Sequence, residues 1–191
     1  SLGIANVVAS LSGHWTKEQL SNFSSFACSL CFIPDSDVPK QGERFGAGER
    51  FVFENGRLAT EMGFQVSVRE IPQGDAKQDP DSYITSLDRW NELTEKDFIL
   101  WYTEKHYDTE GTNDEQLKII SDVCDMLVNV QSDVLQASLL TDLKGKYRKG
   151  TVWKGALTDA ARRRQELKRR QANKKSEELR GYNFYRRGNH Y

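Results

Sequence analysis

Two short apolar runs, residues 27–33 and 64–69, constrain most strongly what this chain can fold into. Each has the length of a buried strand, and a helical spacing of apolar residues over about 49–62 separates them. A further helix at about 17–25 and a short strand at 6–9 are expected before them. Because strands that alternate with helices usually pair in parallel through right-handed crossovers, the sequence predicts an α/β fold with a small parallel sheet flanked by helices.

Beyond residue 81 the apolar spacing is helical only, which predicts an all-α subdomain after the sheet. The expected helices are 82–90, capped by Asp81; 95–107, capped by Thr94; 117–134; and 152–179, ended by Gly181. Residues 182–185 are expected to form an isolated strand. These patterns predict an α/β domain over 1–84, a helical subdomain over 85–150, a basic helix or linker over 151–180, and a tail or the start of a further domain over 181–191.

Acid-rich loops follow both predicted strands. Asp35 and Asp37 lie in the first loop, and Asp79 and Asp81 lie in the second. The carboxyl ends of parallel strands meet at one edge of a sheet, where ligands gather. Four carboxylates in one crevice repel each other unless a hard cation lies between them, and oxygen ligands suit Mg²⁺ or Mn²⁺. The sequence therefore predicts a Mg²⁺ or Mn²⁺ site for phosphate chemistry, with Lys77 able to neutralise a phosphate oxygen.

Each of these loops also has a simpler explanation when taken alone. Asp-Ser-Asp is common in turns whose side chains bond the backbone, and Asp-Pro-Asp is a usual entry to a helix. Lys77 is equally compatible with a solvated surface lysine. The metal interpretation depends on finding both loops directly after strands of one β-α-β unit.

The net charge of -1 conceals a strong asymmetry along the chain. Residues 144–191 carry 16 Lys and Arg against 4 Asp and Glu, whereas the other 143 residues carry 11 against 24. A basic tail on an acidic body favours a nucleic-acid or phosphate partner for the tail, although a solvated, charge-rich helix explains the pattern as well. The candidate nucleic-acid-binding residues are Arg162, Arg163, Arg164, Lys168, Arg169 and Arg170.

Cysteine content and hydropathy bear on the compartment. Three cysteines, an odd number, fit a reducing cytoplasm better than a disulfide framework. Cys28 and Cys31 form a C-x-x-C pair, but they lie in a predicted strand and no second ligand pair has zinc-site spacing, so we expect core cysteines. No run approaches the roughly 20 apolar residues of a membrane span, and the first residues lack the basic start of a signal peptide. A cytoplasmic protein without a membrane partner is expected.

The acidic loops and their surroundings resemble the Toprim domain of bacterial DnaG-type DNA primases. Residues 3–10, with Gly13 and Thr16, look like the segment that leads into the D-x-D strand of that family. Residues 30–37 look like that strand and its D-x-D, and residues 71–72 followed by 77–81 look like the D-P-D loop of primases. The overall style is that of primases from plasmids, phages or other mobile elements.

The resemblance implies the catalytic core of a DNA primase, which makes RNA primers on single-stranded DNA from ribonucleoside triphosphates by Mg²⁺- or Mn²⁺-dependent nucleotidyl transfer. It further implies a replicative helicase domain or protein as a partner. The family's catalytic glutamate, in an E-G context before the D-x-D strand, has no counterpart here, because Glu110-Gly111 lies between predicted helices. Val38-Pro39 also departs from the small residues usual after the D-x-D. The chain is therefore expected to behave as an inactive piece of such a core.

Two other function classes fit the same sequence. The first is a non-catalytic module that docks DNA or a helicase through its basic helix, with the Toprim-like body as scaffold. Tyr182, Phe184 and Tyr185 are then candidates for stacking on bases, although ordinary strand or core aromatics explain them too. The second class is a Toprim nuclease or topoisomerase relative, for which no tyrosine stands out as a nucleophile.

Overall fold

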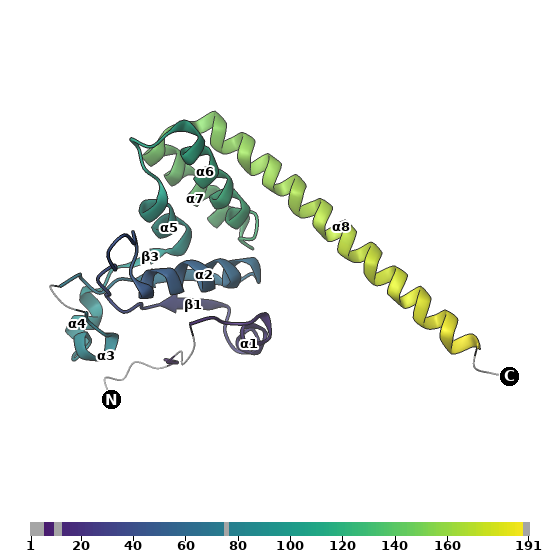
Figure 1. Cartoon of the computed structure of the whole chain (residues 1–191), viewed down its shortest axis with the longest axis horizontal. Helices are drawn as coiled ribbons and strands as arrows, with labels where there is room; N and C mark the ends of the chain where they lie inside the picture. Colours follow the sequence, from purple (N-terminus) through teal and green to yellow (C-terminus); the bar gives the residue numbers. More distant parts are fainter. Residues whose placement is uncertain (1–5, 10–12, 75–76, 189–191) are drawn as a thin grey trace.

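A three-stranded mixed sheet forms one side of the molecule (Figure 1). The computed structural model describes residues 6–9, 13–74 and 77–188. Strand β1 (Ser29–Phe32) pairs in parallel with β2 (Gln65–Arg69), and β2 pairs in antiparallel with β3 (Glu95–Asp97). The parallel pairing of the two apolar runs is therefore confirmed. The expectation of a purely parallel sheet was wrong, because β3 runs in the opposite direction.

Helix α2 (Ala47–Glu61) covers one face of this sheet (Figure 1). Its buried side chains include Val52 and Ala59, and they join a hydrophobic core with Phe32 and Val68 of the strands. Gly56 lets α2 approach Phe98 closely, since a Cβ at this position would meet the Phe98 ring. The alternate apolar side chains of β1 and β2 are thus buried between α2 and one face of the sheet.

Helix α1 (Lys17–Phe23) precedes the sheet and begins with a capping box between Thr16 and Gln19. The strand expected at residues 6–9 does not form: these residues have no strand pairing, and Val7 and Val8 are 67% and 64% exposed. Their two valines suggested burial, but no sheet edge pairs with their backbone. The neighbouring residues 3–5 and 10 of the primase-like segment lie outside the described residues.

The region after β2 departs from the predicted helices. Instead of one helix over 82–90, the chain forms α3 (Pro80–Tyr83) and α4 (Leu87–Glu92). Ser86 caps the second of these helices, and its Oγ accepts the N–H of Arg89 at 3.2 Å. Thr94 does not cap a helix, because the next three residues form β3 and complete the ladder of β2. Such a short charged strand has no periodicity from which to predict it.

The helical part that follows was largely predicted. Helices α5 (Phe98–His106), α6 (Asn113–Leu127) and α7 (Asp133–Tyr147) pack together and share one cluster of buried side chains with the sheet. Asp97 caps α5, and its Oδ1 accepts the N–H of Ile99 at 2.8 Å. The predicted helix over 117–134 instead ends at Leu127, and α7 starts anew with Ser132 at its N-cap.

The last helix, α8 (Gly150–Gly188), packs on α6 with its first turns and then projects away from the body (Figure 1). Trp153 and Ala160 are buried in that contact. The predicted end at Gly181 and the predicted strand over 182–185 were both wrong, because the backbone remains helical to Gly188. None of the helices in the described part of the chain is both long enough and apolar enough to cross a membrane.

The cysteines are placed differently from expectation. Cys124 is buried between α6 and α8, but Cys28 and Cys31 are exposed. The reason is that β1 is an edge strand covered on one face: Leu30 and Phe32 point toward α2, so Cys31 points to the opposite, uncovered face. The core role predicted for Cys28 and Cys31 was therefore wrong.

Candidate metal and phosphate site

The two acidic loops are joined backbone to backbone. Ser36 and Gln78 form an antiparallel bridge. The backbone N–H of Ser36 donates to the carbonyl oxygen of Gln78 at 2.8 Å, and the backbone N–H of Gln78 donates to the carbonyl oxygen of Ser36 at 3.2 Å. Side chains alternate between the two sides of extended backbone. The residues that flank the bridge, Asp35 and Asp37 on one segment and Lys77 and Asp79 on the other, therefore share a side.

The ammonium of Lys77 lies at the centre of this group. Its Nζ is 3.0 Å from Oδ2 of Asp35, 3.4 Å from Oδ1 of Asp79 and 3.6 Å from Oδ1 of Asp37. The hydrogen bond and charge of Asp35, followed by those of the other two carboxylates, raise the pKa of Lys77 above its ordinary value. Three of the four predicted aspartates thus converge on one point, and a lysine cation occupies it.

Helix α2 holds Asp37 in place. Oδ2 of Asp37 accepts the N–H of Gly48 at 2.9 Å, in the first turn of the helix, where the helix dipole favours negative charge. Gly46 and Gly48 permit this approach, because a Cβ on either would clash with the backbone of the Asp35–Asp37 loop. The first loop is therefore held against the start of α2, with Oδ1 of Asp37 left to face Lys77.

Asp81 does not join the group in this structure. It lies exposed in the first turn of α3, and among the described residues it forms no ion pair with Lys77. Asp79, not Asp81, occupies the N-cap position of that helix, where its backbone N–H donates to Ser82 Oγ at 3.2 Å. The predicted helix-capping role of Asp81 was wrong by two residues.

A divalent cation needs several oxygen ligands close together. Among the residues that the structure describes, no three His, Cys, Asp or Glu side chains form a ready cation-binding group. The carboxylates of Asp35, Asp37 and Asp79 nevertheless all reach a single positive centre, and they supply the oxygen chemistry that Mg²⁺ and Mn²⁺ prefer. In this structure the Lys77 ammonium occupies the point that the three carboxylates share.

A second charged cluster stands at the same end of α2, and sequence reasoning missed it. Nζ of Lys105 in α5 is 2.7 Å from a carboxylate oxygen of Glu49 and 2.7 Å from one of Glu70. Burial alone lowers the pKa of Lys105, but the two carboxylates outweigh it and the pKa is raised. These residues are far apart in the sequence and belong to no motif, so only the tertiary fold brings them together.

The six basic residues predicted to bind nucleic acid divide into two sets. Arg162 pairs with Asp159 at 3.1 Å, Arg163 pairs with Asp125 at 2.7 Å, and Arg164 donates to the carbonyl of Val128. These three arginines are engaged within the protein, and two of them fasten α8 to α6. The second set is Lys168, Arg169 and Arg170, which are exposed and make no ion pair in the described part of the chain.

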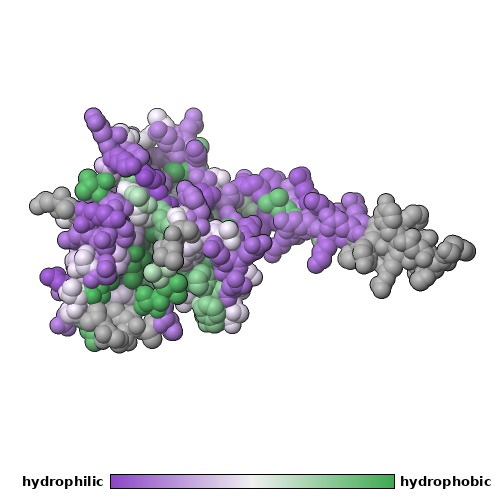
Figure 2. Space-filling model, turned by 60° about the horizontal axis from the view of Figure 1, so that its bottom comes forward, coloured by the Kyte–Doolittle hydropathy of each residue, from purple (hydrophilic) through white to green (hydrophobic). Residues whose placement is uncertain are grey.

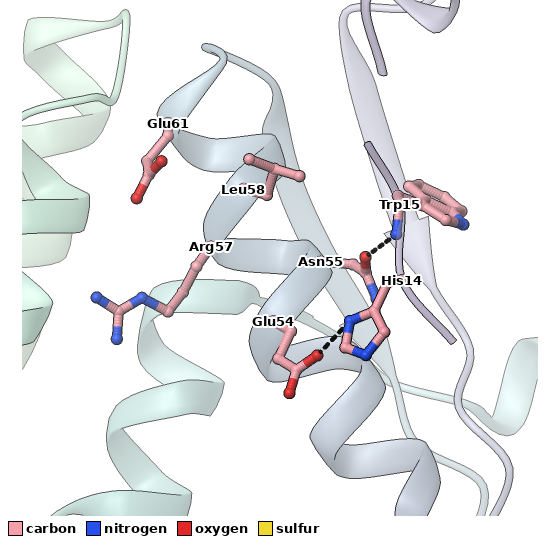
Figure 3. Close-up of a pocket in the computed structure, with 7 residues that line it drawn as sticks. All are labelled: His14, Trp15, Glu54, Asn55, Arg57, Leu58 and Glu61. Atoms are coloured by element: carbon pink, nitrogen blue, oxygen red, sulfur yellow. Dashed lines mark hydrogen bonds and ion pairs between the residues drawn. The ribbon is translucent and has the colours of Figure 1, made fainter. Parts of the chain in front are cut away.

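A shallow hollow of about 370 Å³ lies beside α2, where the segment before α1 crosses the helix (Figure 3). Nδ1 of His14 is 2.8 Å from Oε2 of Glu54, and the N–H of Trp15 donates to Oδ1 of Asn55 at 2.8 Å. Asn55 is only 2% exposed and also donates to the carbonyl of Phe51. The buried amide of Asn55 therefore anchors the crossing segment, and this structural role explains why a polar side chain is buried here.

No protein-family model matches this chain, and no curated protein sequence matches it.

Proposed function

We propose that the crevice between the two acidic loops binds Mg²⁺ or Mn²⁺ and supports nucleotidyl transfer, as part of the catalytic core of a DNA primase. The observation that carries this proposal is the convergence of Asp35, Asp37 and Asp79 on the Lys77 ammonium across the Ser36–Gln78 bridge. The resemblance of both loops to those of DnaG-type primases favours this chemistry over other metal-dependent reactions. Its substrates would be ribonucleoside triphosphates on a single-stranded DNA template, in the cytoplasm.

The residues of the crevice have separate tasks in this proposal. Asp35 and Asp79 would hold the cation, and Asp37 would contribute its Oδ1 while its Oδ2 stays bonded to Gly48. Lys77, released from the carboxylates, would pair with a phosphate oxygen of the triphosphate. An ion held by these carboxylates would supply positive charge against the negative charge of the transferring phosphoryl group. Asp81, close by in α3, is left to hold a second cation or to tune the first.

The acid/base residue of the reaction is not supplied by the glutamates near the crevice. Glu49 and Glu70 both pair with Lys105, and Glu49 also accepts the N–H of Gly46. We therefore expect this chain by itself to make no primers. An extension assay with template, four ribonucleotides and Mn²⁺ checks this, and a metal-dependent product would contradict it.

The direct test is Mn²⁺ titration by calorimetry or electron paramagnetic resonance. The informative variant is Asp35→Asn with Asp79→Asn, because Asp37 also bonds Gly48 and its loss would disturb α2. We expect the double variant to lose binding, while Asp88→Asn, an exposed aspartate of α4, keeps it. Lys77→Met should bind Mn²⁺ several-fold more tightly, since no ammonium competes for the carboxylates. Equal Mn²⁺ affinity in all four proteins would exclude the site.

A second candidate function is a non-catalytic module that docks nucleic acid through α8. It is favoured by the second set of basic residues, Lys168, Arg169 and Arg170, which the body leaves exposed. Here Lys77 would serve as a permanent counter-ion that stabilises the two loops without metal. Nucleic-acid binding that persists in the Asp35→Asn, Asp79→Asn variant, together with no Mn²⁺ binding by the wild type, would support this candidate over the first.

A further inference from the structure

The part of α8 beyond its contact with α6 is exposed to solvent, and only its first residues, Gln165 and Lys168, still border a hollow that Val128 and Gln136 also line. All residues from 165 to 178, here called the free segment, are exposed, and they form no ion pair within the described part of the chain. Figure 2 shows mostly hydrophilic side chains along the visible face of this helix. A helix that is polar all round has a partner, is stabilised by many i,i+4 ion pairs, or is not stable by itself. The free segment has no such pairs, which points to a partner.

The charge of the free segment has one sign over its middle. Residues 167–176 contain five basic residues and no acidic one: Lys168, Arg169, Arg170, Lys174 and Lys175. Arg170 and Lys174 are four positions apart on one face, where like charges repel and weaken an isolated helix. A polyanion would relieve that repulsion, so the chemistry of the segment selects a phosphate-rich partner.

The five cations surround the helix instead of lining one face. Successive residues of an α-helix are turned by about 100° about its axis. With Lys168 at zero, Arg169, Arg170, Lys174 and Lys175 lie at about 100°, 200°, 240° and 340°, and no gap exceeds about 100°. A helix lying on one phosphate backbone would use cations on one side only. Cations on all sides fit a ligand that presents phosphates on both flanks of the helix.

We propose that the free segment lies in the major groove of double-helical DNA, with the phosphates of both strands on either side of it. This inference rests on the nucleic-acid-docking function proposed above. The major groove is about 12 Å wide and an α-helix with its side chains is about 10–12 Å across, so the fit is close. The fourteen residues of the free segment extend about 21 Å, the length of roughly six base pairs.

Two other polyanions fit the arrangement less well. The major groove of double-stranded RNA is too deep and narrow for a helix to enter, and a single strand offers phosphates to one side of the helix. The acidic body of the same chain is out of reach, because α8 leads away from it (Figure 1). Arg163 and Arg164 stay bonded to α6 and fix the direction in which the free segment leaves the body.

The experiment compares two variants that remove charge from opposite sides of the helix. Arg169→Gln with Arg170→Gln clears the side near 100–200°, and Lys168→Gln with Lys175→Gln clears the opposite side. A matched control is Lys17→Gln with Lys118→Gln, two exposed lysines of α1 and α6. Each protein is titrated with a 20-base-pair DNA duplex, the corresponding single strand and an RNA duplex at several salt concentrations. Circular dichroism verifies that the helix content is unchanged.

We expect the wild type to prefer the DNA duplex, and both α8 variants to lose affinity for it by a similar factor. Each variant should also lower the slope of log affinity against log salt by about 2, because two phosphate contacts are gone. Equal binding of duplex and single strand, or loss in only one variant, would overturn the groove geometry while keeping the docking function. Absence of all nucleic-acid binding would overturn both, and salt-sensitive self-association would identify the acidic body of a second copy as the partner.

Discussion

At the scale of single residues, small side chains decide whether the candidate crevice can form. Gly46 and Gly48 let the Asp35–Asp37 loop touch the first turn of α2, and the bond from Gly48 to Asp37 then sets the direction of one carboxylate. Both loops could be found from the sequence because they follow predicted strands. The central position of Lys77 could not, since it depends on the register of the Ser36–Gln78 bridge.

Gly48→Ala should damage both the fold and the crevice. The added Cβ would clash with the backbone carbonyl of Asp35, a fixed group that cannot rotate away as a side chain could. We expect a loss of about 1–3 kcal/mol in the free energy of unfolding and weaker Mn²⁺ binding. The matched control is Gly155→Ala in α8, where nothing lies within 4 Å of the new Cβ and a gain of up to about 1 kcal/mol is expected. Equal denaturation midpoints for the two variants would contradict this account.

The stability of the protein should also report on His106. Burial lowers the pKa of His106 below its ordinary 6.5, and the ring stacks on Tyr102 with centroids 4.0 Å apart. The folded state therefore resists a proton that the unfolded state accepts. This contribution to stability is complete above about pH 6.5 and is lost as the pH falls through the folded pKa. His106→Phe keeps an aromatic ring, so urea titrations should show a shallower fall between pH 7 and 5. The same slope as the wild type would refute this role.

At the scale of elements, the spacing of apolar residues predicted the helices and strands that have one apolar face along their whole length. The two parallel strands and most core positions of α2 and α6 could be found in this way, but Leu117 and Val134, which continue the same apolar spacing, are exposed. Elements defined by long-range contact could not. Strand β3 is three charged residues that pair only because β2 has an open edge, and residues 6–9 have a strand-like composition without such an edge.

The anchoring of α8 should depend on Trp153. This side chain is fully buried against α6, whereas Leu167, further along the same helix, is 57% exposed. Trp153→Ala is expected to lower the free energy of unfolding by about 3–5 kcal/mol, because it leaves a large cavity. Leu167→Ala should change it by less than about 0.5 kcal/mol. A small effect of Trp153→Ala in chemical denaturation would mean that α8 is held at its base by Arg163 and Arg164 instead.

At the scale of the whole molecule, the acidic body and the basic end of the chain are also separate in space. The acidic residues belong mostly to the sheet and the helices around it. Of the 27 basic residues, 16 lie in residues 144–191, and 12 of these belong to α8, the helix that points away from the body (Figure 1). The opposite charges of the two parts attract each other, but the free segment of α8 forms no ion pair with the body in the described part of the chain. We expect the buried first turns of α8 to keep the two parts separate.

Small-angle X-ray scattering tests this separation. A compact chain of 191 residues has a radius of gyration of about 16 Å. With α8 extended, we expect a value larger by several Å, and no change between 50 mM and 500 mM salt. If the basic helix instead folded back onto the acidic body, the radius would be near 16 Å at low salt and would rise as salt screened the attraction.

The Ser36–Gln78 bridge has a consequence for the order of folding events. Its two residues are separated by all of α2 and β2, so we expect their pairing to follow the docking of helix and sheet. The carboxylates then come together as one of the last steps, and the first step of opening can part them while the rest of the protein stays native. Amide hydrogen exchange at Ser36 and Gln78 should thus run faster than exchange in the centre of α2. Its rate would report the opening of the crevice separately from the unfolding of the rest of the protein.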